Sequence, residues 1–139
     1  MSNNIIGIIA ANNIRYSPYI FFYTNILDEC GVSYELIYPD RNGIEEEWVG
    51  IVHKVQWNNK RHRLFEYEIY AKKVKRIIKK RKYTKLIVLT SVIATYMGNW
   101  LSKHYKNMIK FALSFYIFYR KVADKKIIKN AKNMLTNEF

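Results

Sequence analysis

Cysteine and histidine are scarce in this 139-residue chain, and both scarcities limit its chemistry. The single cysteine, Cys30, cannot form an intrachain disulfide, which suits a reducing cytoplasm. The three histidines, His53, His62 and His104, fall in three different predicted elements without ligand spacing, so we expect no metal site. A G-x-G-x-x-G fingerprint, a Walker loop and a Ser-His-Asp order are also absent from the sequence. Sequence pattern alone therefore identifies no catalytic residue.

Long hydrophobic runs are missing as well. The longest uncharged stretch is the 17 residues from 86 to 102, which include several hydroxyl side chains, whereas a spanning helix needs about 20 apolar residues. The N-terminus has no basic region and an apolar run of only seven residues, unlike a signal peptide. We expect a single domain over residues 1–139 and no transmembrane segment.

Acidic side chains are few, and the charge is unevenly distributed. The chain has 24 Lys and Arg against 11 Asp and Glu, which gives a net charge of +13. Residues 1–63 have a net charge of −1 and residues 64–139 a net charge of +14. One side of the molecule should therefore face an anionic partner, which could be nucleic acid, anionic lipid or a phosphorylated small molecule. The hydrophobic content of 50% is ample for a core.

Short β-branched apolar runs alternate with helical patterns along the chain. Strands are predicted at residues 4–11, 33–38, 50–57, 85–90 and 108–115. Helices are predicted at residues 18–30, 64–82, 92–107 and 119–135. This alternation predicts an α/β fold with a doubly wound, mainly parallel Rossmann-like sheet of about five strands and helices on both faces.

Local signals set several of the predicted boundaries. Ser17 followed by Pro18 is typical of a helix start, with Ser17 as N-cap, and Gly31 is typical of a helix end. Residues 39–43 have the composition of a turn. The acidic run at residues 45–47 is predicted to be a solvated surface.

Two loops are candidates for a ligand site, because open α/β sheets bind ligands outside the carboxyl ends of their strands. The loop after the first strand offers Asn12, Asn13 and Arg15, which could equally be a connection whose amides satisfy local backbone groups. After the fourth strand, Thr90 and Ser91 lie at a predicted helix start that favours an anion. An ordinary N-cap explains these two residues more simply.

The helix at residues 64–82 is the most basic element. An apolar stripe runs along it from Tyr67 to Ile78, and cations fill the rest of its circumference. The cations are Lys72, Lys73, Lys75, Arg76, Lys79, Lys80, Arg81 and Lys82. A merely solvated face fits poorly because few acids balance them. Nucleic-acid binding has no recognisable motif in this sequence, whereas attraction to an anionic membrane surface needs only clustered Lys and Arg.

Two stretches, "NIIGIIAANNIRYSPYIFFYTNILDECGVSYELIYPDRN" and "KLIVLTSVIATYMGNWLSKHYKN", carry a family resemblance over roughly residues 4–107. Their order of strand, helix and turn resembles the N-terminal Rossmann-like domain of GT-B glycosyltransferases, most closely the family 4-like enzymes of bacterial capsular and surface polysaccharide synthesis. The resemblance implies sugar transfer from a nucleotide-sugar donor to a lipid-linked acceptor. It also implies a cytoplasmic, peripheral location at the inner face of the cell membrane, with the basic face docked on lipid and residues 12–15 lining the interdomain cleft.

The sequence departs from the family pattern in its second half. The family's donor-binding domain, with its paired-glutamate motif, is not present, and residues 108–119 replace an expected Asp-x-Arg-Asp-like segment. We therefore expect a truncated enzyme that binds no nucleotide-sugar by itself and works with a separate donor-binding subunit, or self-associates through its exposed cleft face. The alternatives are a basic nucleic-acid-binding α/β protein and an inactive remnant of a larger enzyme.

Overall fold

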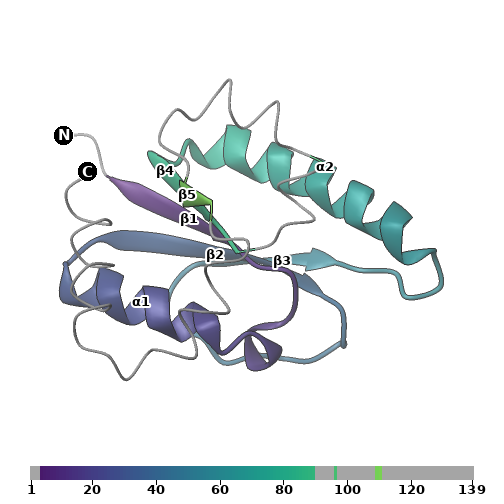
Figure 1. Cartoon of the computed structure of the whole chain (residues 1–139), viewed down its shortest axis with the longest axis horizontal. Helices are drawn as coiled ribbons and strands as arrows, with labels where there is room; N and C mark the ends of the chain where they lie inside the picture. The colour runs from purple at the N-terminus through teal and green to yellow at the C-terminus, as the bar shows by residue number, and fades with distance from the viewer. Residues whose placement is uncertain (1–3, 90–95, 97–108, 111–139) are drawn as a thin grey trace.

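The computed structural model describes residues 4–89, 96 and 109–110, and these form an α/β fold with a parallel sheet (Figure 1). The strands are β1 (Ile5–Ile9), β2 (Ser33–Asp40), β3 (Val52–Gln56), β4 (Lys85–Val88) and β5 (Ile109–Lys110). They lie in the order β3-β2-β1-β4-β5, and all four neighbouring pairs are parallel. The predicted α/β class and parallel sheet are confirmed. The predicted helix at 92–107 is described only at Tyr96, which is helical, and the predicted helix at 119–135 lies outside the described residues.

Strand β1 is the centre of the sheet and is buried on both faces. Its Ile9 pairs with Ile37 of β2 on one side and with Val88 of β4 on the other. Ile8 and Ile9 have no exposed surface, and they belong to different core clusters. A strand between two parallel neighbours with a helix layer on each face must be apolar along its whole length, which explains the uninterrupted "IIGII".

Two helices cover opposite faces of the sheet (Figure 1). Helix α1 (Tyr19–Glu29) packs through Ile20, Tyr23 and Leu27 onto the face that carries Ile8. Helix α2 (Arg63–Arg81) packs through Tyr70, Val74 and Ile78 onto the face that carries Ile9. The predicted apolar stripe of α2 is therefore its buried side.

Helix α2 has a cap at each end. The Nδ1 atom of His62 accepts a hydrogen bond from the backbone N–H of Leu64 at 3.3 Å, which satisfies one of the free donors of the first turn. At the other end Lys82 adopts a left-handed conformation with φ of 55°, and its N–H donates to the carbonyl of Ile78 at 3.0 Å. The chain then turns directly into β4.

The start of α1 differs from the sequence prediction. A short 3-10 helix, η1 (Ile14–Tyr16), precedes α1, and the Ser17 hydroxyl donates back to the Asn12 carbonyl at 3.4 Å instead of capping α1. The predicted end is confirmed, because Gly31 has a positive φ of 66°. The predicted turn at 39–43 begins later than expected, since Pro39 and Asp40 still belong to β2.

No helix connects β2 to β3. Residues 41–51 cross between these parallel strands as an irregular segment that is fastened to the neighbouring loops. The carboxylate of Glu46 accepts hydrogen bonds from the backbone N–H groups of Ile14 at 2.8 Å and Arg15 at 2.7 Å, and Trp48 packs against Phe21 with ring centroids 5.5 Å apart. Glu46 is thus half-buried, and the prediction of a fully solvated acidic run is wrong for this residue.

Candidate functional site at the carboxyl edge and along α2

The loops that follow β1 and β2 meet at the carboxyl edge of the sheet, and Asn13 joins them. Its amide nitrogen donates to Asp40 Oδ1 at 2.7 Å, and its amide oxygen accepts from the backbone N–H groups of Arg41 at 2.9 Å and Asn42 at 3.2 Å. The Asn13 side chain is completely buried. Asn13 therefore holds this edge together, as expected for an amide that satisfies backbone groups.

The other candidate residues of this edge have different surroundings. Asn12 is half-buried, and its Oδ1 accepts from the amide of Asn42 at 3.1 Å. The Arg15 side chain is exposed and lines a pocket of about 410 Å³ together with Glu45, Glu46 and Glu47. A cation among three carboxylates is a poor anion site. Thr90 and Ser91 lie outside the described residues.

Asp40 is held ionised at the same edge. Burial alone would raise the pKa of its carboxyl, but hydrogen bonds from Asn13, Lys54 and the Ile44 N–H outweigh burial and lower this pKa. The Lys54 ammonium lies 3.2 Å from Asp40 Oδ2. The carboxylate thus fixes the end of β2 against both of its neighbours.

A cluster of aromatic rings follows β3, and sequence reasoning did not identify it. The Arg41 guanidinium lies 5.1 Å from the ring centroid of Trp57 and 5.7 Å from that of Tyr67, and its Nη1 donates to the Tyr67 hydroxyl at 3.1 Å. The ring of Trp57 also meets Tyr67 edge-on with centroids 5.0 Å apart. Cation–π contacts of this kind are worth about 0.5–2 kcal/mol each, so the position of Trp57 is well fixed.

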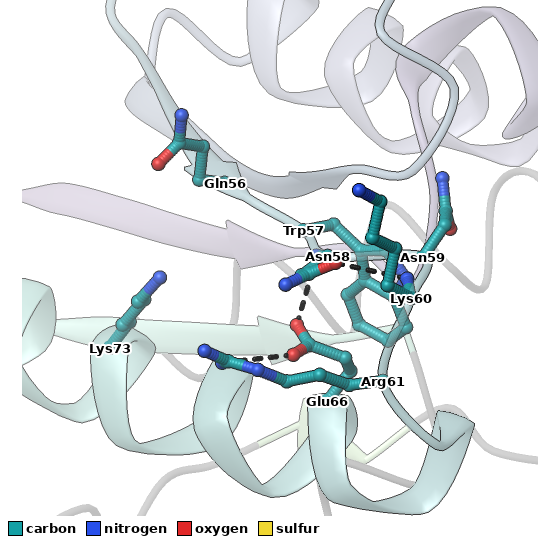
Figure 2. A pocket seen from close by; sticks show the side chains of 8 residues that line it. All are labelled: Gln56, Trp57, Asn58, Asn59, Lys60, Arg61, Glu66 and Lys73. Atoms are coloured by element: carbon teal, nitrogen blue, oxygen red, sulfur yellow. Dashed lines mark hydrogen bonds and ion pairs between the residues drawn. The ribbon is translucent and has the colours of Figure 1, made fainter.

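A polar pocket of about 490 Å³ opens beside this cluster, between the β3–α2 connection and α2 (Figure 2). Its lining is Gln56, Trp57, Asn58, Asn59, Lys60, Arg61, Glu66 and Lys73. Glu66 is only 2% exposed, and its carboxylate accepts from the Asn58 N–H at 3.1 Å and from Arg61 Nη1 at 3.2 Å. The lining thus has three cations and one carboxylate, and one of these cations, Arg61, is already a donor to that carboxylate.

Apart from Arg63 in the first turn and Arg81 in the last, the basic residues of α2 and its C-cap fall into three groups. Lys72, Arg76, Lys79 and Lys80 are exposed along the side of α2 opposite its buried stripe, and we call them, with the exposed Phe65, the outer face of α2. Lys73 and Lys75 are half-buried on its flanks, and Lys82 is exposed at its end. Lys72 makes a weak i,i+4 contact with Glu68 at 3.5 Å.

Arg81 does not belong with the other cations. Seven residues after Val74, it lies on the sheet-facing side of the last turn of α2, where its side chain remains 37% exposed. Its Nε donates to both carboxylate oxygens of Glu35 at 3.1 Å, and its Nη2 donates to Oε1. Tyr83 donates its hydroxyl to Glu35 Oε2 at 2.6 Å, and His53 Nε2 lies 2.8 Å from the same oxygen. Arg81, which the sequence groups with the membrane-facing cations, is thus partly exposed and is paired with this buried carboxylate.

Glu35 is the most strongly perturbed acid of the described residues, although it lies away from the carboxyl edge. Its side chain is 2% exposed, and burial would raise the pKa of its carboxyl. The hydrogen bonds from Arg81, Tyr83 and His53 outweigh burial and lower this pKa from 4.5 to about 2. The cluster joins β2, β3 and the end of α2, so its role is structural.

No family model, curated protein or solved structure matches this chain. Within the described part, neither helix has both the length and the apolar character to cross a bilayer. The same residues contain no group of three or more His, Cys, Asp or Glu side chains that could hold a metal ion.

Proposed function

We propose that this chain is the acceptor- and membrane-side domain of a glycosyltransferase-type enzyme of bacterial surface polysaccharide synthesis. In this proposal its sheet is the doubly wound, Rossmann-like half of a GT-B architecture. The domain docks peripherally on the inner face of the cell membrane, and a donor-binding partner supplies the nucleotide-sugar. The parallel strand order, with polar loops gathered at one carboxyl edge, supports this assignment.

The outer face of α2 carries the membrane part of the proposal. Nine Lys and Arg against two Glu lie between residues 63 and 82, and the buried stripe turns Lys72, Arg76 and Lys80 away from the sheet. Each cation held near an anionic leaflet contributes about 1 kcal/mol, so three of them suffice for weak, reversible docking.

Two exposed apolar side chains favour lipid over nucleic acid. Leu64 is 58% exposed and Phe65 is 55% exposed at the start of α2, and Phe65 lies on the same side of the helix as Lys72 and Arg76. An aromatic ring beside a row of cations can enter the interface of a bilayer, whereas DNA phosphates offer it no apolar surroundings. Nucleic-acid binding remains the second candidate, because the same cations could also contact phosphates.

Binding to neutral vesicles, anionic vesicles and duplex DNA distinguishes membrane docking from nucleic-acid binding. The full chain is sedimented with neutral phosphatidylcholine vesicles and with vesicles containing phosphatidylglycerol, and is titrated with duplex DNA at about 50 mM salt. We expect preference for the anionic vesicles, and we expect Phe65→Ala to weaken vesicle binding severalfold without changing DNA affinity. Equal binding to both vesicle types would overturn the membrane assignment. DNA binding tighter than vesicle binding, with no effect of Phe65→Ala, would favour the second candidate.

A further inference from the structure

The polar pocket beside α2 has a feature that the proposed membrane docking does not use: an excess of positive charge in a preformed cavity. Among the described residues, the ammonium groups of Lys60 and Lys73 form no ion pair, and Glu66 engages one terminal nitrogen of Arg61. The charges of Glu66 and Arg61 cancel, so the lining has a net positive charge of two from Lys60 and Lys73. We propose that this pocket binds the phosphate monoester of a hydroxyl-rich small molecule or headgroup.

The charge and size of the pocket match such a ligand. A phosphate monoester has a charge of about −1.5 to −2 near neutral pH, close to the two positive charges that the lining keeps. The pocket volume of about 490 Å³ lies in the range of small-molecule sites. Figure 2 shows Lys73 and Gln56 at one end of the pocket and Lys60 and Asn59 at the other, so a ligand between them would meet a cation at either end.

Neutral polar groups complete the lining. The amide side chains of Gln56, Asn58 and Asn59 are hydrogen-bonding partners for hydroxyl groups. A lining of this kind suits a phosphorylated sugar or polyol better than an apolar anion. Trp57 contributes the aromatic part of the wall, and its contact with Arg41 fixes its orientation.

Hydrogen bonds within the protein hold the loop that forms the pocket. Asn58 Oδ1 accepts from the Lys60 N–H at 2.9 Å, the Asn58 carbonyl accepts from the Arg61 N–H at 3.2 Å, and the Asn58 N–H donates to Glu66. The Asn59 amide also donates to the Arg41 carbonyl at 2.9 Å. Because these bonds hold the loop in place, binding would cost little conformational entropy.

Membrane docking and phosphate binding use different residues, so the two proposals can fail separately. The double variant Lys60→Gln/Lys73→Gln removes two charges from the pocket. The matched control Arg76→Gln/Lys80→Gln removes two charges from the outer face of α2 and leaves the pocket lining unchanged. Urea unfolding of both variants verifies that each folds as the wild-type chain does.

Calorimetric titration with glucose 1-phosphate, inorganic phosphate and glucose tests the pocket in the full chain. We expect glucose 1-phosphate to bind more tightly than inorganic phosphate, and glucose alone not to bind. The pocket variant should lose at least about tenfold in affinity for glucose 1-phosphate, the worth of one charge-assisted hydrogen bond, whereas the control should stay within about twofold. Equal losses in both variants would mean attraction to net charge only, and would overturn the proposal, as would unchanged binding in the pocket variant.

Binding to two kinds of vesicle shows whether the natural ligand is a lipid headgroup or a soluble phosphate ester. Vesicles of phosphatidic acid expose a phosphate monoester, and vesicles of phosphatidylglycerol at matched surface charge expose a diester. If the natural ligand is a lipid headgroup, the pocket variant loses its preference for phosphatidic acid. If the ligand is a soluble phosphate ester, the variant binds both vesicle types as the wild-type chain does while losing affinity for glucose 1-phosphate.

Discussion

Replacing Glu35 by Gln gives the most quantitative test of the internal ion-pair cluster. In the wild-type chain, the pKa of this carboxyl falls from 4.5 to about 2 through its contacts with Arg81, Tyr83 and His53. A shift of this size is worth about 3 kcal/mol of folding stability at neutral pH, at 1.36 kcal/mol per pKa unit. Glu35 is buried but its main partner Arg81 is 37% exposed, so solvent screening makes this value an upper limit.

The sign of the pH dependence follows from the direction of the shift. The folded protein binds the proton on Glu35 more weakly than the unfolded chain does, so the stabilisation is present above about pH 4.5. It is lost as the pH falls from about 4.5 to about 2. The variant Glu35→Gln lacks this titration. The difference in unfolding free energy between the two proteins should therefore be about 1–3 kcal/mol at pH 7 and should narrow below about pH 4.5.

Urea unfolding monitored by circular dichroism between pH 7 and pH 3 measures this difference, with Glu68→Gln as the matched control. Glu68 is about half exposed and lies 3.5 Å from Lys72, so its loss should cost about 0.5 kcal/mol or less. A loss below about 1 kcal/mol for Glu35→Gln at pH 7, or a difference that does not change with pH, would refute the reasoning.

Two further substitutions test how the sheet and its carboxyl edge are held together. Asn13→Ala removes the acceptor of the Arg41 and Asn42 N–H groups and one of the donors to the Asp40 carboxylate at this partly buried edge. We expect a loss of about 1–3 kcal/mol in urea unfolding. A loss below about 0.5 kcal/mol would show that Asn13 does not hold the edge. Gly7→Ala would place a Cβ 2.7 Å from Tyr83 Cδ2. The Tyr83 ring cannot easily move away, because its hydroxyl donates a hydrogen bond to Glu35. We expect about 1–3 kcal/mol of destabilisation by overpacking, and an unchanged melting temperature would contradict this packing.

The fold was predictable where a local pattern determines it. The uninterrupted β-branched run around Ile8 indicated a strand buried on both faces, and the spacing of Val74 and Ile78 indicated the buried side of α2. These patterns act within a few residues, because the strand and helix periods are properties of the backbone itself. The class of fold follows from their alternation.

The contacts of charged residues were harder to predict from the sequence, because they depend on residues that are distant along the chain. Glu35 meets His53 and Arg81, which lie 18 and 46 residues away. One signal was present: Arg81 follows Val74 by seven residues, so its side chain leaves α2 on the sheet-facing side, where Glu35 accepts its hydrogen bonds. No local signal distinguished Glu46 from the two exposed glutamates beside it, since only the folded loops bring it to η1.

Partition of two double variants onto anionic vesicles tests the central claim, that the outer face of α2 docks on the membrane. Arg76→Gln/Lys80→Gln should bind phosphatidylglycerol vesicles about 30-fold more weakly than the wild-type chain, at about 1 kcal/mol for each lost charge. Lys60→Gln/Lys73→Gln has the same net charge but keeps the outer face, so it should bind such vesicles nearly as well as the wild-type chain. Equal weakening of both variants, or no weakening of the first, would contradict the claim.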